Sequence, residues 1–129
     1  MKAKILLVED NEQNRYLATF LLEQRGHQVV HAESGPLGLE LAATARPDLI
    51  LLDIQLPGMD GHAVARALKS DPALRSIPIV AVTSYAMAGD REKVFAAGAQ
   101  GYIEKPIDPE TFAAEVERFL PPAREESAP

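Results

Sequence analysis

The feature that most constrains the fold is the alternation of short apolar runs with longer stretches of helical period. Five runs rich in Ile, Val and Leu each precede a segment whose apolar residues recur three or four positions apart. This order is typical of βαβ units, in which helices cover both faces of a parallel sheet. The sequence therefore predicts an α/β fold with a doubly wound, five-stranded parallel sheet. The predicted strands are residues 4–9, 28–32, 49–53, 79–83 and 101–104.

The predicted helices follow these strands at residues 12–25, 34–46, 61–69, 88–97 and 109–120. Gly26 is expected to end the first helix as a left-handed cap. In the second helix, Leu37, Leu41 and Ala45 form the stripe that we expect to be buried, and Pro47 prevents further helix. The (βα)5 order predicts a single domain over residues 1–120, followed by a flexible C-terminal tail at 121–129.

Composition excludes several classes of function. The chain of 129 residues has no Cys, so it has no disulfide framework and no thiolate metal site. Its formal net charge of −6 opposes binding to nucleic-acid phosphates. No stretch approaches the roughly 18 apolar residues of a membrane span. We therefore predict a cytoplasmic protein that contacts neither nucleic acid nor membrane.

Polar residues stand where the apolar runs end. Asp53 closes a run of four apolar residues, and a carboxylate buried there must be paired, hydrogen-bonded or bound to metal. Glu9 and Asp10 follow the first run, Thr83 ends the fourth, and Lys105 follows the fifth. In a sheet of strand order 2-1-3-4-5, the ligand crevice opens at the carboxyl ends of strands one and three. The sequence therefore predicts that these five residues meet at one edge.

The residue types at that edge suit phosphoryl chemistry. The three carboxylates carry three negative charges, which one Mg²⁺ and the Lys105 ammonium would balance. We expect Mg²⁺, with Mn²⁺ as an alternative, because both prefer oxygen ligands. A carboxylate can attack a phosphoryl group once the incoming oxygens are neutralised, and the product is an acyl phosphate. Asp53 is the predicted nucleophile, with Thr83 and Lys105 as donors to the new phosphate oxygens.

These residues, together with the loop Leu56-Pro57-Gly58-Met59-Asp60-Gly61 and with Pro106 after Lys105, resemble the receiver domain of bacterial two-component response regulators, the CheY-like family. The likeness covers about residues 3–120. It implies a flavodoxin-like fold in which Asp53 takes a phosphoryl group from a histidine kinase or a histidine phosphotransfer protein. It also implies that Mg²⁺ is held by Glu9, Asp10, Asp53 and the backbone carbonyl of Gln55.

The same resemblance implies a switch. Thr83 and Tyr102 would be the switch pair, and the surface of helix four, strand five and helix five would bind an unidentified downstream protein. Gln55 and Tyr85 occupy positions that tune self-hydrolysis in this family, and the bulk of Tyr85 suggests slow dephosphorylation. Glu9 replaces the Asp of many members and reaches one methylene further, so it can meet the metal through water.

Simpler interpretations remain open for single residues. Asp10 is also a suitable N-cap for the first helix. Lys105 could be a surface lysine before a turn, and Thr83 could merely cap a loop. Tyr102 could be a static aromatic on a strand. Glu12 and Arg15 are interpreted as solvated helix surface that faces a kinase.

Several function classes also remain open. The leading hypothesis is a receiver that accepts phosphate and then changes its affinity for a partner, either as a stand-alone protein or as part of a hybrid histidine kinase. A degenerate receiver would bind partners without phosphorylation. A flavin-binding redox protein is disfavoured because Glu9 and Asp10 would repel the flavin phosphate. A metal-dependent phosphatase is disfavoured because the aspartyl phosphatases place their nucleophile after the first strand.

Overall fold

The computed structural model describes residues 2–56, 58–84 and 88–121. Its five parallel strands are β1 Lys4–Val8, β2 Gln28–Ala32, β3 Leu49–Asp53, β4 Ile79–Thr83 and β5 Gly101–Glu104. They form one sheet in the order β2-β1-β3-β4-β5, which confirms the predicted topology. The first strand ends at Val8, one residue before the predicted end. The Glu9 amide still donates to the carbonyl of Ala32 at 2.9 Å.

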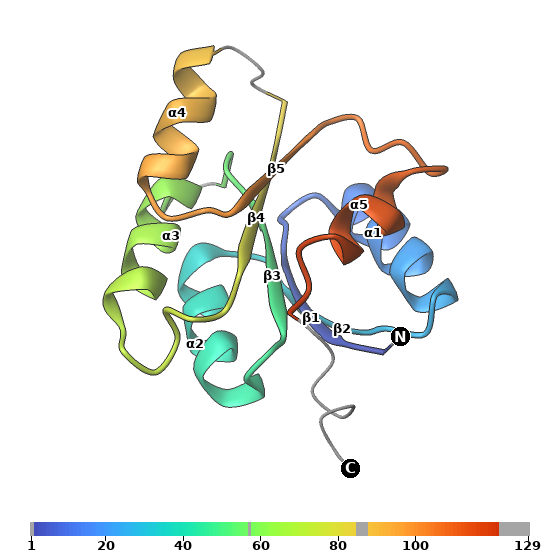
Figure 1. Ribbon diagram of the computed structural model, residues 1–129, viewed down its shortest axis with the longest axis horizontal. Coiled ribbons are helices and arrows are strands. Elements are labelled where there is room, and N and C mark those ends of the chain that lie inside the picture. The colour runs from blue at the N-terminus through green and yellow to red at the C-terminus, as the bar shows by residue number, and fades with distance from the viewer. Residues whose placement is uncertain (1, 57, 85–87, 122–129) are drawn as a thin grey trace.

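Helices cover both faces of this sheet, as Figure 1 shows. The helices are α1 Glu12–Gln24, α2 Gly35–Ala45, α3 Gly61–Ser70, α4 Ala88–Ala96 and α5 Phe112–Glu117. Two of them, α1 and α5, lie on one face, and the other three lie on the opposite face. Each face has its own apolar core, and every residue of β3 and β4 is buried. This burial explains why these two strands are almost continuously apolar.

The last helix is shorter than the predicted 109–120. Asp108 begins a turn in which its side-chain Oδ1 accepts from the Glu110 amide at 2.9 Å. Its carbonyl accepts from the amides of Thr111 and Phe112. Such local bonds compete with helix formation, and regular helix begins only at Phe112. Phe112 and Val116 are buried against the sheet.

The predicted buried stripe of α2 is only partly correct, since Leu41 packs against the core but Leu37 does not. Leu37 is 37% exposed, and Leu41 and Ala45 are only partly buried. The buried residues are Gly35, Gly38 and Ala42. A Cβ at Gly38 would lie 2.9 Å from Cγ2 of Val8, so α2 approaches β1 through small residues and its leucines flank the contact.

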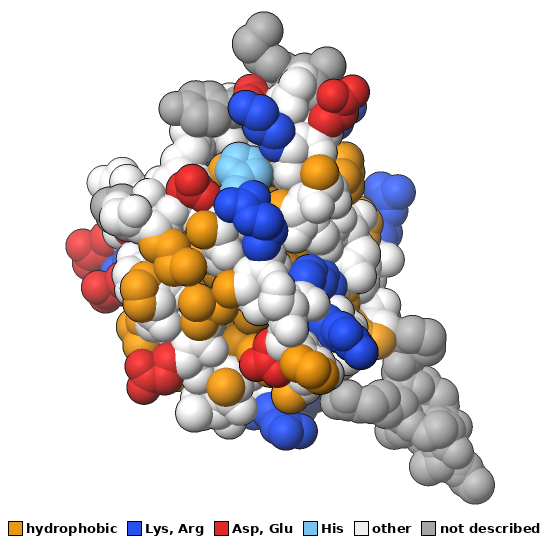
Figure 2. Space-filling model, turned by 90° about the vertical axis from the view of Figure 1, so that its left-hand side faces the viewer, with side chains coloured by type: hydrophobic (Ala, Val, Ile, Leu, Met, Phe, Trp, Pro, Cys, Tyr) orange, Lys and Arg blue, Asp and Glu red, His pale blue; other side chains and the backbone are white. Residues whose placement is uncertain are grey.

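The surface is mixed in charge. Figure 2 views the side on which α3 and α4 lie, and there hydrophobic side chains gather mainly at the lower left while Lys and Arg side chains run down the centre and right. Within the described ranges, no helix has the length and apolarity to cross a membrane. The predicted C-terminal tail lies outside the described residues except for Pro121.

Candidate functional site

Three carboxylates meet at the carboxyl edge of the sheet. Asp53 ends β3, and Glu9 and Asp10 follow β1, which is the direct neighbour of β3. One carboxylate oxygen from each of the three residues lies within 4.8 Å of the other two. Glu9 and Asp53 are each 3% exposed, whereas Asp10 is open to solvent. The predicted convergence of these three side chains is confirmed.

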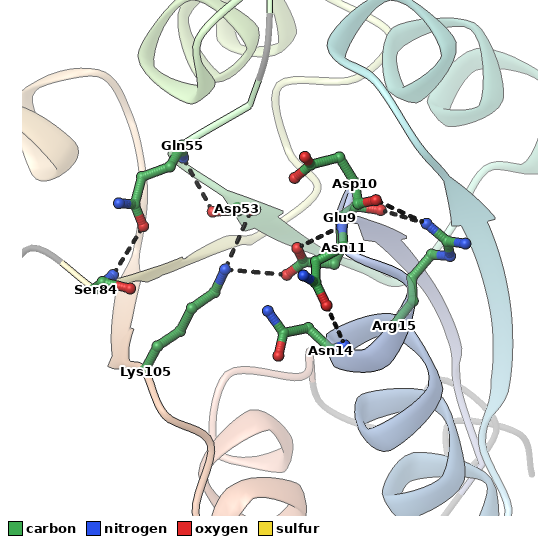
Figure 3. A network of polar contacts seen from close by, with 9 residues as sticks. All are labelled: Glu9, Asp10, Asn11, Asn14, Arg15, Asp53, Gln55, Ser84 and Lys105. Carbon is green, nitrogen blue, oxygen red and sulfur yellow. Dashed lines mark hydrogen bonds and ion pairs between the residues drawn. The ribbon is translucent and has the colours of Figure 1, made fainter.

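Lys105, which directly follows β5, completes the charged cluster. Its Nζ lies 3.2 Å from Oε1 of Glu9 and 3.2 Å from Oδ2 of Asp53, as Figure 3 shows. Its amide donates to the carbonyl of Thr83 at 2.8 Å, so the Lys105 backbone is anchored at the end of β4. The side chain is only 13% exposed, and the alternative of a solvated surface lysine is wrong.

The loop after β3 holds the other oxygen of Asp53. The Gln55 amide donates to Asp53 Oδ1 at 3.0 Å, and the Gln55 side-chain Oε1 accepts from the Ser84 amide at 3.0 Å. Gln55 therefore joins the loop after β3 to the end of β4. Thr83, the last residue of β4, is buried at the same edge.

The cluster is short of positive charge. Burial raises the pKa of the Glu9 carboxyl, and the charge of Asp53 raises it further, while the Asn11 amide and Lys105 act in the opposite direction. With all three acids ionised, Lys105 leaves a formal charge of −2. Three hard oxygen donors with this charge fit a divalent cation such as Mg²⁺. Glu9, Asp10 and Asp53 are therefore the residues that could hold one.

Comparison with known proteins agrees with this geometry. The family model of the response regulator receiver domain matches residues 5–117. The chain belongs to this family. A curated relative is the polar-differentiation response regulator DivK of Brucella anthropi, 42% identical over 120 residues, which cover 93% of this chain and 98% of DivK. Receiver domains serve two-component signalling and are not classical enzymes, which excludes the flavin and phosphatase interpretations.

Solved receiver structures share the fold closely. Chemotaxis protein CheY4 of Vibrio cholerae superimposes with a TM-score of 0.88 at 30% identity, covering 93% of this chain and all of that one. The receiver domain of a sensor histidine kinase from Pseudomonas aeruginosa gives a TM-score of 0.84 at 33% identity, covering 92% of this chain and 98% of its own. That structure contains a magnesium ion coordinated in its active-site cleft.

The first turn of α1 contains contacts that were not predicted from the sequence. Asn11 is the N-cap, because its side-chain Oδ1 accepts from the Asn14 amide at 2.9 Å. The alternative that Asp10 caps this helix is therefore wrong. Asn is as good a cap as Asp, and its place next to Glu12 was the available signal.

The prediction that Arg15 is solvated helix surface is also wrong. Its side chain is 15% exposed, and Nη1 donates to the carbonyls of Glu9 and Asp10 at 3.1 and 3.3 Å. Glu12 is exposed, as expected.

Two further residues, Tyr102 and Tyr85, were predicted to transmit the signal or to tune its decay. Tyr102 is half-buried on β5, and the Arg91 guanidinium lies 5.1 Å from the centre of its ring. This is a cation–π distance that joins α4 to β5. Tyr85, predicted to slow dephosphorylation, lies outside the described residues.

Proposed function

We propose that this receiver accepts a phosphoryl group on Asp53 from the phosphohistidine of a histidine kinase or histidine phosphotransfer protein. The observation that supports this most is the buried Asp53 carboxylate, which lies 3.2 Å from the Lys105 ammonium beside two further carboxylates. We expect the reaction to require Mg²⁺, which Glu9, Asp10, Asp53 and the backbone carbonyl of Gln55 would hold. Mn²⁺ can replace it, since it also prefers oxygen ligands.

The transfer conserves charge and atoms. A carboxylate oxygen of Asp53 attacks phosphorus, the bond from phosphorus to the imidazole nitrogen breaks, and the nitrogen keeps the electron pair and takes up a proton. The Lys105 ammonium can donate to the phosphoryl oxygens from its place beside Asp53. A divalent cation held by Glu9, Asp10 and Asp53 would supply further positive charge to those oxygens. The product is an acyl phosphate on Asp53.

The response to phosphorylation would pass through β4 and β5. The new phosphate adds only about one negative charge, because the carboxylate charge is lost, so new hydrogen bonds must favour the active state. Thr83 is the proposed donor to the phosphate, and Tyr102 is the residue proposed to move in response. The two lie two residue pairs apart on the β4–β5 ladder, where Tyr102 pairs with Ala81 and Thr83 pairs with Glu104. Gln55 is the proposed modulator of self-dephosphorylation, because it touches both Asp53 and Ser84.

The proposed surface for a downstream protein is formed by α4, β5 and α5. It contains a cavity of about 400 Å³ whose lining includes Arg91, Phe95, Tyr102 and Phe119. Phe95 is 44% exposed there. The lining also includes the charged side chains of Glu115 and Arg118, and a mixture of aromatic and Arg side chains is typical of surfaces that bind proteins.

The test is incubation of the protein with Mg²⁺ and a small phosphodonor, followed by intact-mass measurement. We expect a base-labile adduct of one phosphoryl group that Asp53→Asn abolishes and that chelation of Mg²⁺ prevents. Asp71→Asn is the matched control, because Asp71 follows the C-terminal end of α3, away from the carboxylate cluster, and Asn can keep its bond to the Ala73 amide; this variant should keep the adduct. A folded wild-type protein without adduct would favour the degenerate receiver.

A further inference from the structure

Arg15 points back from α1 to the acid pair. Its Nη1 lies 3.1 Å from the Glu9 carbonyl oxygen and 3.3 Å from that of Asp10. Its Nη2 lies 3.8 Å from Oε2 of Glu33, an exposed side chain in the loop after β2. Figure 3 shows Arg15 and Lys105 on opposite sides of the acid pair. Lys105 therefore approaches a carboxylate of the acid pair, whereas Arg15 approaches its backbone carbonyls from the other side.

The two carbonyls lie beyond the regular sheet. The pairing of β1 with both its neighbours ends at Val8, and the Glu9 amide makes one further bond to β2. A carbonyl next to buried structure needs a donor, because an unmatched one costs free energy. The guanidinium supplies that donor to two consecutive peptide groups. It thereby fixes the backbone that carries the side chains of Glu9 and Asp10.

Arg15 and Lys105 differ in the atoms that they use. Lys105 binds carboxylate oxygens of Glu9 and Asp53, the same kind of atom that a metal would need. Arg15 binds only backbone oxygens of the acid pair, so the carboxylates stay available. The Asn11 amide adds a bond to Glu9 Oε2 at 3.1 Å. Arg15 can therefore keep its contacts while a cation is bound.

We propose that Arg15 is a positioning residue that presets Glu9 and Asp10 for the divalent cation. This inference rests on the proposed function, since it assumes that the carboxylate cluster binds metal. The planar fork of a guanidinium can serve two carbonyls and a carboxylate at once, which the single ammonium of a lysine does less well. Partners that orient metal ligands typically contribute about 10- to 100-fold to metal affinity.

The test measures Mn²⁺ binding through the electron paramagnetic resonance signal of the free ion, without any phosphodonor. For Arg15→Ala we expect binding about 10-fold weaker than wild type. A role through charge alone predicts the opposite sign, because loss of a positive charge near the site would tighten cation binding. Unchanged or tighter binding by Arg15→Ala would therefore overturn the proposal.

Arg15→Lys separates geometry from charge and protects the test against misfolding. It keeps the positive charge and an aliphatic stem, so it should fold even if Arg15→Ala does not, which a urea titration checks. We expect it to bind Mn²⁺ more weakly than wild type and to shift the carbonyl ¹³C resonances of Glu9 and Asp10 in the metal-free protein. Wild-type affinity with unshifted carbonyls would contradict the role.

Two controls separate this inference from the proposed function. Glu33→Gln removes the exposed ion pair but keeps both carbonyl bonds, and we expect an affinity within about 2-fold of wild type. Asp10→Asn removes a proposed ligand. If wild type does not bind Mn²⁺, or if Asp10→Asn binds it as tightly as wild type, the proposed metal site and the Arg15 role both fail. If that site is present and Arg15→Lys retains full affinity, only the Arg15 role fails.

Discussion

This receiver contains two clusters of charged and buried polar side chains, and the two differ in how well their negative charges are paired with positive ones. The Asp53 cluster has three carboxylates and one contacting ammonium. The second cluster joins Glu117 of α5 to Arg25 and to the fully buried His27 side chain. Burial and Asp53 raise the pKa of Glu9, whereas the hydrogen bond from Arg25, and secondarily that from His27, lowers the pKa of Glu117. The first cluster is prepared for a cation, and the second is already matched.

The hydrogen bonds of the Glu117 cluster join three segments of the chain. His27 Nδ1 accepts from the Ala3 amide at 3.1 Å, which assigns the ring hydrogen to Nε2. Nε2 lies 2.8 Å from Glu117 Oε2, which also accepts from Arg25 Nε at 3.0 Å. The cluster thus ties the N-terminal segment and the end of α1 to α5. It stabilises the fold without offering a place for a ligand.

The largest expected effect comes from breaking the matched cluster. Glu117→Gln should lower the free energy of unfolding by about 1–2 kcal/mol, because the acceptor of the buried His27 ring N–H loses its charge. Urea denaturation measures this. Glu115→Gln, on the same helix, is the control and should change stability little. Equal losses for the two variants would mean that the Glu117 cluster contributes no specific stability.

A smaller effect of opposite sign is expected in the Asp53 cluster. Glu9→Gln removes a buried carboxylate whose pKa is raised by burial and by Asp53. The metal-free variant should gain about 1 kcal/mol in unfolding free energy, as is common when a destabilising functional group is removed. It should also bind Mn²⁺ more weakly than wild type. A loss of stability in the metal-free state would show that the Glu9 carboxylate is already well matched.

The sequence predicted the Asp53 cluster better than the Glu117 cluster for a physical reason. Parallel strands end at one edge, so polar residues after apolar runs identified Glu9, Asp10, Asp53 and Lys105 without any knowledge of side-chain packing. His27 and Glu117 are 90 positions apart, and no periodicity relates them. Their contact depends on how α5 packs against α1.

The sequence pattern also did not predict how closely α2 packs against β1 or how far the Arg15 side chain extends. The stripe of α2 was assigned to leucines because apolar volume usually marks the buried face, but Gly38 lets the helix lie nearer to Val8. Arg15 was assigned to solvent because its helical position looks polar, but a long side chain can extend back to the preceding strand. Both errors concern distances in the folded structure, which the periodicity of strands and helices does not encode.

The smallest expected effect is a difference in pH dependence between the two clusters. The folded state holds the Glu9 proton more tightly than the unfolded chain, so metal-free stability should fall as pH rises from the ordinary Glu value toward the raised pKa. The folded state holds the Glu117 proton less tightly, so its contribution should be lost as pH falls from the ordinary value through the lowered pKa. Urea denaturation across this acidic range, on wild type and each Gln variant, measures how the unfolding free energy changes with pH for each residue.

Saturating Mg²⁺ should abolish the pH dependence due to Glu9 and leave that due to Glu117 unchanged, because Glu9 lies in the carboxylate cluster and Glu117 does not. A pH dependence due to Glu9 that persists with Mg²⁺ would argue that the cation does not contact this cluster.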